Sequence, residues 1–315
     1  MLSIEQKSVI ENHLSKPQEI VEKSSEDIFR VFVIRNGKTV RDKELLNQIA
    51  GLMKTNYQNR YSRWERLLHK LNITNALFKK LASKYIKEYY RDFGIYISDD
   101  IFKEIKVVQI YDDISKEKQL DGSANCLIAK VDGRIASFEE KLHTAIHEIL
   151  HIIERRLYKI KLSENSDKSW SQTWYTNVIG NNKIGVFINE GFVELISSHI
   201  CTKEKMLTKA IYKESIYIVD KIISHLAENN QEQYKKIMDY LIKGNLLGDM
   251  RYMLIVKDTL GKEFTRELWN LSFDDGPWLI TFMEKYPEVF WEKKVSPYIK
   301  EYIWPIDWEY PFEEK

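Results

Sequence analysis

Residues 139–158 read EEKLHTAIHEILHIIERRLY, and this stretch carries the residues from which fold and chemistry can first be inferred. Its apolar residues recur at three- and four-residue spacing, which predicts a single amphipathic helix. His147 and His151 are four residues apart, so on a helix they lie on one face and can bind the same metal ion. Glu148 completes an HExxH motif, in which the glutamate accepts a proton from a metal-activated water. The metal expected for this motif is a single Zn²⁺ ion.

A second motif lies downstream, where Ile188 to Glu194 reads INEGFVE in a predicted helix over residues 188–200. Glu190 and Glu194 are four residues apart and therefore share a face of that helix. One carboxylate can bind the metal while the other accepts the proton on the second nitrogen of a ligand histidine, which fixes its tautomer. Two acids buried without a cation would be costly, so a metal site explains the pair better than core packing does.

HEILH followed by NEGFVE resembles the gluzincin zinc metallopeptidases, the clan of thermolysin-like and M1-like enzymes. The resemblance implies that His147, His151 and Glu190 bind zinc, that Glu148 is the general base and that Glu194 supports a ligand histidine. It covers only these two short segments. The metzincin class is excluded, because Glu154 and Leu157 stand where its glycine and third histidine would be. Residues 152–189 separate the two motifs by more than in thermolysin or the M1 enzymes, so the subfamily stays open.

The same chemistry requires a donor that stabilises the developing oxyanion, often a tyrosine or a histidine. We select Tyr252, which lies in a YMLIVKDTLG segment loosely like one in the M1 enzymes, with Tyr175 and His225 as alternatives. The chain has 18 tyrosines, so core packing is the competing interpretation for each of them. His143, one turn before the HExxH motif, and His199, beyond the second motif, are ambiguous between function and packing.

The remaining pattern predicts a predominantly helical α+β fold with a small mixed sheet and a helical C-terminal half, and the resemblance implies that the catalytic domain is thermolysin-like. A soft boundary at Gly94 separates an N-terminal helical region (1–94) from the metallopeptidase domain (95–315). Strand character marks three segments, of which the last could form an edge strand that binds an extended peptide. These segments are Phe29–Ile34, Ile105–Tyr111 and Ala124–Val131.

Prolines and clusters of polar residues indicate where the remaining loops and extended segments lie. Residues 162–183, rich in Ser, Asn, Thr and Trp, are predicted to form a long loop. Two or three further helices are expected between residues 203 and 272. The tail from Phe273 contains five of the six prolines and is expected to be extended.

Composition limits the classes of partner. With 48 basic and 47 acidic side chains the formal charge is +1, so no strong field attracts nucleic acid. No segment approaches the roughly 18 apolar residues of a membrane span, and the first residues lack the apolar run of a secretory signal. Cys126 and Cys201 form no CxxC pair and are expected to be reduced thiols. We therefore expect a cytoplasmic protein, whose oligomeric state the pattern does not indicate.

The functional expectation is a zinc-dependent metallopeptidase that hydrolyses a peptide or protein substrate. One alternative is a proteolytic toxin or regulator of the same clan with a narrow specificity. Another is a catalytically silent helical interaction protein that keeps a metal for stability. Glu148 argues against the silent protein, because a purely structural site needs no general base and fills all four coordination positions with protein ligands.

Overall fold

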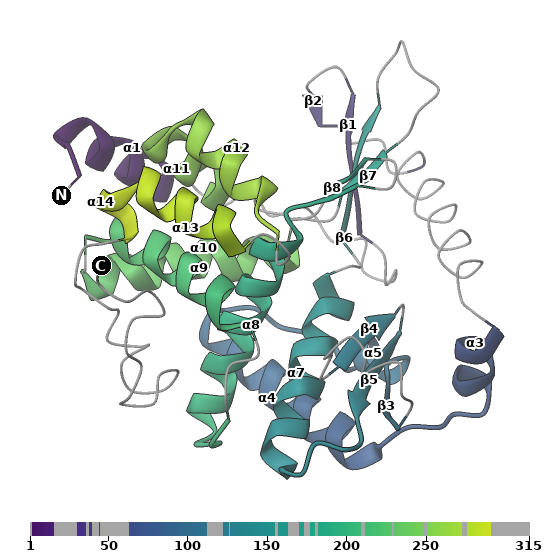
Figure 1. Cartoon of the computed structure of the whole chain (residues 1–315). Coiled ribbons are helices and arrows are strands. Elements are labelled where there is room, and N and C mark those ends of the chain that lie inside the picture. Colours follow the sequence, from purple (N-terminus) through teal and green to yellow (C-terminus); the bar gives the residue numbers. More distant parts are fainter. Residues whose placement is uncertain are drawn as a thin grey trace.

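Helices make up most of the described chain, and two small sheets lie beside them (Figure 1). The computed structural model confirms the predicted class, α+β and predominantly helical. None of the helices in the described residues combines the length and the apolar content of a bilayer span. The structure describes residues 2–15, 30–35, 38–39, 44, 63–111, 122–125, 127–154, 157–162, 170–172, 177–179, 182–208, 212–228, 230–247, 251–272 and 276–290.

The three-stranded sheet has the order β3-β5-β4, with β5 parallel to β3 and antiparallel to β4. Strand β3 (Lys106–Ile110) confirms the strand predicted there. The single strand predicted over 124–131 is wrong, because the chain reverses inside it. The reversal gives β4 (Gly122–Asn125) and β5 (Ile128–Asp132), with Asn125 paired to Ile128.

The two faces of β5 bury different residues, as the period of a strand requires. Ala129 and Val131 belong to the main core beneath α7 (Phe138–Glu154), whereas Ile128 packs with Leu68 of α3 (Arg63–Lys70). On the α3 side Lys130 also pairs with the buried carboxylate of Glu65 at 2.8 Å. The sheet is therefore covered on both faces, by α7 on one side and α3 on the other.

Helix α7 (Phe138–Glu154) contains the HExxH motif and ends earlier than predicted. Leu157 and Tyr158, assigned to the helix from the sequence, belong instead to β6 (Leu157–Leu162). That strand pairs in parallel with β1 (Arg30–Arg35), a partner far away in the sequence. Local periodicity cannot report such a pairing, which explains the error.

The second sheet has the order β2-β1-β6-β7-β8-β9. The loop predicted over residues 162–183 is wrong for the residues that the structure describes, because they form strands of this sheet. These strands are only three residues long and contain Ser, Gln, Asn and Lys beside the β-prone Trp, Val and Ile, so their composition alone does not mark them as strands. They are β7 (Trp170–Gln172), β8 (Asn177–Ile179) and β9 (Asn182–Ile184), while β2 is Lys38–Thr39.

The C-terminal half is helical, as predicted, and packs around α8 and α9 (Figure 1). The extended tail predicted from Phe273 is wrong for its described part. Pro277 and Pro287 lie in the first turns of two helices, where proline is tolerated. The helices are α8 (Val186–Lys203), α9 (Lys213–Leu226), α10 (Gln231–Leu247), α11 (Arg251–Leu260), α12 (Lys262–Asn270), α13 (Gly276–Lys285) and α14 (Pro287–Phe290).

N-terminal elements pack against elements from the other side of the predicted boundary. Helix α1 (Ile4–Ser15) lies along α11, where His13 contacts Asp258 at 3.0 Å. Helix α4 (Ala76–Asp92) packs on α7, and the short α5 (Asp99–Lys103) leads into β3. The boundary at residue 94 itself stays a prediction.

The close approach of α8 and α9 depends on Gly191. A Cβ atom at this position would lie 2.6 Å from the backbone oxygen of Ser215 and 2.9 Å from Val219 Cγ2. Ser215 and Val219 are on α9, so only a residue without a side chain lets the two helices pack at this distance.

We predict that Gly191→Ala destabilises the protein. The gain in helix propensity is about 1 kcal/mol, but overpacking against a backbone costs roughly 1–3 kcal/mol and forces α9 to move. Thermal unfolding should shift down by several degrees. An unchanged or higher melting temperature would contradict the close packing of α8 on α9.

A buried carboxyl group lies on the other side of α9. Asp220 is 1% exposed and accepts hydrogen bonds from Tyr234 at 2.7 Å and from Ser224 at 3.4 Å. Burial raises its pKa to about 7, although the Tyr234 hydrogen bond, the charge of Lys221 and the Ser224 hydrogen bond oppose the shift. The folded protein therefore holds this proton at pH values where the unfolded chain has lost it.

We predict that this group makes the free energy of unfolding fall as the pH rises from about 4 to about 7. Asp220→Asn keeps an acceptor for Tyr234 but cannot ionise. The variant should therefore lose this component of the slope and exceed the wild type in stability above pH 7, by a few kcal/mol at about 1.4 kcal/mol per pKa unit. Denaturant midpoints between pH 4 and 8 test this.

The matched control for this series is Asp100→Asn. Hydrogen bonding to Lys103 lowers the pKa of the exposed Asp100 carboxyl, so this group titrates below the range of interest. Parallel pH profiles for the wild type and Asp220→Asn would contradict the prediction.

Candidate metal centre

Helix α7 presents its two motif histidines from a buried face. His147 and His151 are 1% and 2% exposed, and their rings are 4.7 Å apart in an edge-to-face arrangement. The helix is held between the three-stranded sheet and α8. Its apolar residues fix its rotation, so both imidazoles face α8.

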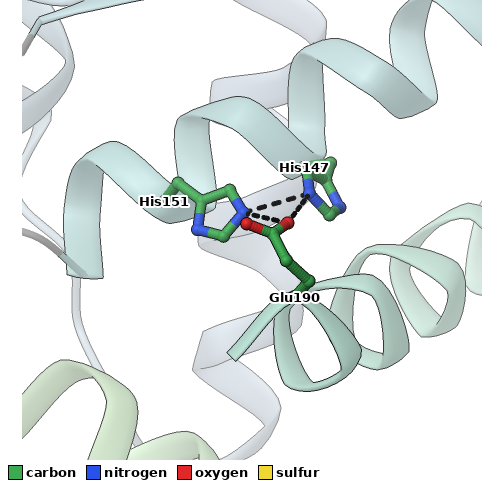
Figure 2. A group of neighbouring side chains, drawn as sticks. All are labelled: His147, His151 and Glu190. Atoms are coloured by element: carbon green, nitrogen blue, oxygen red, sulfur yellow. Dashed lines mark hydrogen bonds and ion pairs between the residues drawn. The ribbon is translucent and has the colours of Figure 1, made fainter. Parts of the chain in front are cut away.

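Helix α8 supplies the carboxylate that completes the cluster (Figure 2). Glu190 Oε2 lies 2.9 Å from His151 Nε2 and 3.2 Å from His147 Nε2, and the two Nε2 atoms are 3.1 Å apart. Within the described residues these three side chains form the one group whose ligand atoms converge as a metal requires. The structure thus brings together the three residues predicted as ligands.

The entry into α8 positions Glu190. Gly185 precedes the helix with φ of 79°, a left-handed conformation that favours glycine, and donates its N–H to the Trp269 carbonyl at 2.8 Å. Glu190 lies in the second turn, one residue before the close contact at Gly191. Its position therefore depends on how α8 packs on α9 as well as on α7.

The second nitrogen of each histidine also has a partner on α8. Glu194 Oε2 lies 2.7 Å from His147 Nδ1, and this carboxylate is completely buried. The Asn189 side-chain amide lies 3.4 Å from His151 Nδ1. Because a carboxylate accepts, the His147 ring carries its proton on Nδ1 and directs the Nε2 lone pair into the cluster. The Asn189 contact is made by the amide nitrogen Nδ2, which donates to His151 Nδ1.

The donor set fits a divalent cation. A carboxylate accepts hydrogen bonds, so Glu194 accepts one from the Nδ1–H group of His147. When this ring is neutral, the lone pair of its Nε2 atom then faces Glu190. Acceptors in this arrangement require a proton or a metal ion between them. Ligand atoms about 2.0–2.2 Å from zinc in a tetrahedron lie roughly 3.3–3.6 Å apart, so a slight opening of the cluster accommodates the ion.

Without a cation, the same charges act on protons. Burial alone would lower the pKa of His147, but hydrogen bonds to Glu190 and Glu194 and the charges of Glu194 and Glu148 raise it well above its ordinary value. Burial raises the pKa of Glu190, and the charges and hydrogen bonds of the two histidines lower it overall. Both shifts describe a site that attracts positive charge.

Glu148, the predicted general base, lies in the same buried turn of α7 and is 5% exposed. Its charge contributes to the raised pKa of His147, which places the carboxylate within electrostatic reach of the cluster. The predicted general base and the two histidines of the cluster thus come from the same helix.

Tyr252, predicted as the oxyanion donor, is not brought to this cluster. Its ring packs edge-to-face on Phe192 at 5.1 Å, and the residue is 1% exposed. Phe192 is two positions beyond Glu190 and therefore points to nearly the opposite side of α8. Burial and the charge of Asp220 raise the pKa of the Tyr252 hydroxyl, as in a core residue.

A different tyrosine, missed from the sequence, lies at the cluster. The Tyr212 ring is 5.4 Å from the His147 ring and inclined by 31° to it. It stands at the N-terminal end of α9, and no local pattern links it to the two motifs. His225 lies at the other end of that helix, about 20 Å away along its axis, and Tyr175 is outside the described residues.

The two ambiguous histidines have different surroundings. His199 Nδ1 lies 3.2 Å from the Tyr89 hydroxyl between α8 and α4, and burial lowers its pKa to about 4. The lowered pKa keeps this partly buried ring neutral at ordinary pH. His143 is one turn before His147 and contacts Ser197 and Glu194.

Asn189 was also missed from the sequence. The available signal was its position beside Glu190, because a residue adjacent to a ligand on the same helix can reach a neighbouring histidine.

Comparison of the chain with models of protein families, with curated proteins and with solved structures found no match.

We predict that the protein binds about one zinc ion per chain and that His147→Ala weakens zinc binding at least 100-fold, because a ligand and its Glu194 support are both lost. Equilibrium dialysis followed by elemental analysis measures the stoichiometry. His225→Ala, at the far end of α9, is the control and should bind like the wild type. A wild-type protein that binds no zinc would contradict the ligand set.

Proposed function

We propose that the protein is a zinc-dependent metallopeptidase of gluzincin type, with a thermolysin-like catalytic domain. The observation that carries the proposal is the convergence of His147 Nε2, His151 Nε2 and Glu190 Oε2 within 3.2 Å of one another, beside a buried glutamate in the HExxH position. The cytoplasmic location expected from the sequence belongs to the same proposal.

The number of ligands favours catalysis over a structural role. Structural zinc sites are closed by four protein ligands, whereas catalytic sites use three and leave a position for water or substrate. In the described part of the chain the cluster has three members. A zinc ion held there would polarise a peptide carbonyl and activate water for attack on it.

Glu148 moves the proton in this proposal. Its carboxylate accepts the proton of the attacking water and delivers it to the nitrogen of the leaving amine, so the peptide bond breaks without a covalent intermediate. Its burial beside the cluster restricts the carboxylate and excludes bulk water, which strengthens its interaction with nearby charge.

Tyr212 replaces Tyr252 as the candidate donor to the developing oxyanion. Its contact with the His147 ring brings the residue to the cluster, and a phenolic hydroxyl can donate a hydrogen bond to an anionic oxygen. The preceding residues 209–211 lie outside the described chain.

A peptide substrate is favoured by the strand beside α7. Among the described strands β4 pairs only with β5, so its other edge offers backbone donors and acceptors. An extended peptide can add to such an edge through main-chain hydrogen bonds. Because β4 also packs against the HExxH helix, a peptide bound there would run beside α7.

The decisive variant is Glu148→Gln, which keeps the shape of the side chain but cannot accept the proton. We expect peptide hydrolysis to fall at least 100-fold while zinc affinity stays near that of the wild type. Cleavage of a peptide library, read by mass spectrometry in the presence of zinc, measures the loss.

The matched control is Glu140→Gln, the same change in the first turn of the same helix, which should retain activity. Equal activity of Glu148→Gln and the wild type would contradict the role of Glu148. A wild type that binds zinc but cleaves neither peptides nor candidate proteins would favour the metal-stabilised interaction protein.

A further inference from the structure

A buried polar cluster lies behind the metal-facing atoms, on the side of His147 away from Glu190. Glu194 is 0% exposed, and its two carboxylate oxygens face different histidines of α7. Oε2 lies 2.7 Å from His147 Nδ1, and Oε1 lies 3.3 Å from His143 Nε2. Ser197, one turn later on α8, lies 3.1 Å from His143 Nε2.

The direction of these hydrogen bonds follows from their chemistry. An ionised carboxylate can only accept, so the nitrogen that faces Glu194 Oε1 must carry a proton, which makes His143 Nε2 a donor. The Ser197 hydroxyl donates to the Glu194 backbone carbonyl at 3.0 Å and is 3.3 Å from Glu194 Oε2. Its oxygen is then left to accept from His143. His143 Nε2–H thus faces Glu194 Oε1 and the Ser197 oxygen as a donor, and Ser197 donates in turn to the Glu194 backbone carbonyl.

The geometry points to His143, together with Ser197, as a positioning residue for the metal site. We propose that it fixes the orientation of the Glu194 carboxylate and, through it, the tautomer and tilt of the His147 ring. The inference rests on the metal site of the proposed function and extends it by one layer. His143 is not one of the three residues whose ligand atoms converge, and its contact with Glu194 links it to His147.

A purely packing role does not account for the polar contacts. An apolar side chain would fill the same space, but it would leave Oε1 of a fully buried carboxylate without its His143 donor, and buried acceptors are costly to leave unsatisfied. Without this donor Oε1 is held less firmly, and the carboxylate is freer to rotate about its last torsion. Rotation lengthens the 2.7 Å contact that directs His147 Nε2 towards Glu190.

Two substitutions of similar size separate the hydrogen bond from packing. His143→Leu fills the space without a donor, whereas His143→Gln places an amide N–H near the position of the imidazole Nε2. We expect His143→Leu to weaken zinc binding about tenfold and His143→Gln to stay within about threefold of the wild type, since partners behind metal ligands are worth 10–100-fold in affinity. Competition with a chromogenic chelator measures the zinc dissociation constant.

A double-mutant cycle tests whether the effect passes through Glu194. In a Glu194→Gln background the carboxylate is absent, so His143→Leu should change zinc affinity by less than about twofold further. The melting temperature of each metal-free variant reports folding separately from affinity. Equal zinc affinity of His143→Leu and the wild type, or an equal tenfold loss in the Glu194→Gln background, overturns the inference.

The outcomes separate this inference from the proposed function. A wild type without zinc affinity would contradict the metal site itself, whereas a zinc-binding wild type with an unaffected His143→Leu variant contradicts only the positioning role. If His143→Leu does not fold, Ser197→Ala takes its place, with an expected two- to fivefold weakening from the lost support of His143 and Glu194. Unchanged affinity in Ser197→Ala then overturns the inference.

Discussion

Two carboxylates removed from water between α7 and α8 are the constraint on which the rest of this structure depends. Glu194 is completely buried and the Glu190 side chain is 17% exposed, and carboxylates so far removed from water are tolerated only when hydrogen bonds and positive charge compensate for lost hydration. Histidines of α7 supply both. The helices must therefore meet in one register, because a shift of either would leave an acid without its partner.

The register is maintained by packing on both sides of the pair. The three-stranded sheet supports α7 from one side, and α9 supports α8 from the other through the close contact at Gly191. The contact that brings Tyr212 to His147 comes from the same α9 helix. Stability and chemistry are thus coupled, since a change that moves α9 also moves a candidate ligand and a candidate donor.

Sequence periodicity predicted the helical elements around the cluster well, and it failed where pairing is long-range. Strands β7, β8 and β9 are three residues long and lie in a segment rich in Ser, Asn and Thr, so the composition of that segment resembled a loop. The first two residues of strand β6 were assigned to the end of a helix because its partner β1 lies more than a hundred residues earlier. Prolines in the first turns of α13 and α14 suggested an extended tail although both helices form there.

The sequence by itself determined the spacing of His147 with His151 and of Glu190 with Glu194, because residues four apart share a face on any helix. It could not determine which other side chains surround that site. Packing between helices decided that Tyr252 lies behind α8 while Tyr212 lies at His147, and that Asn189 and His143 complete the layer behind the ligands. These contacts join residues of different elements, whose meeting depends on the buried core and not on any local pattern.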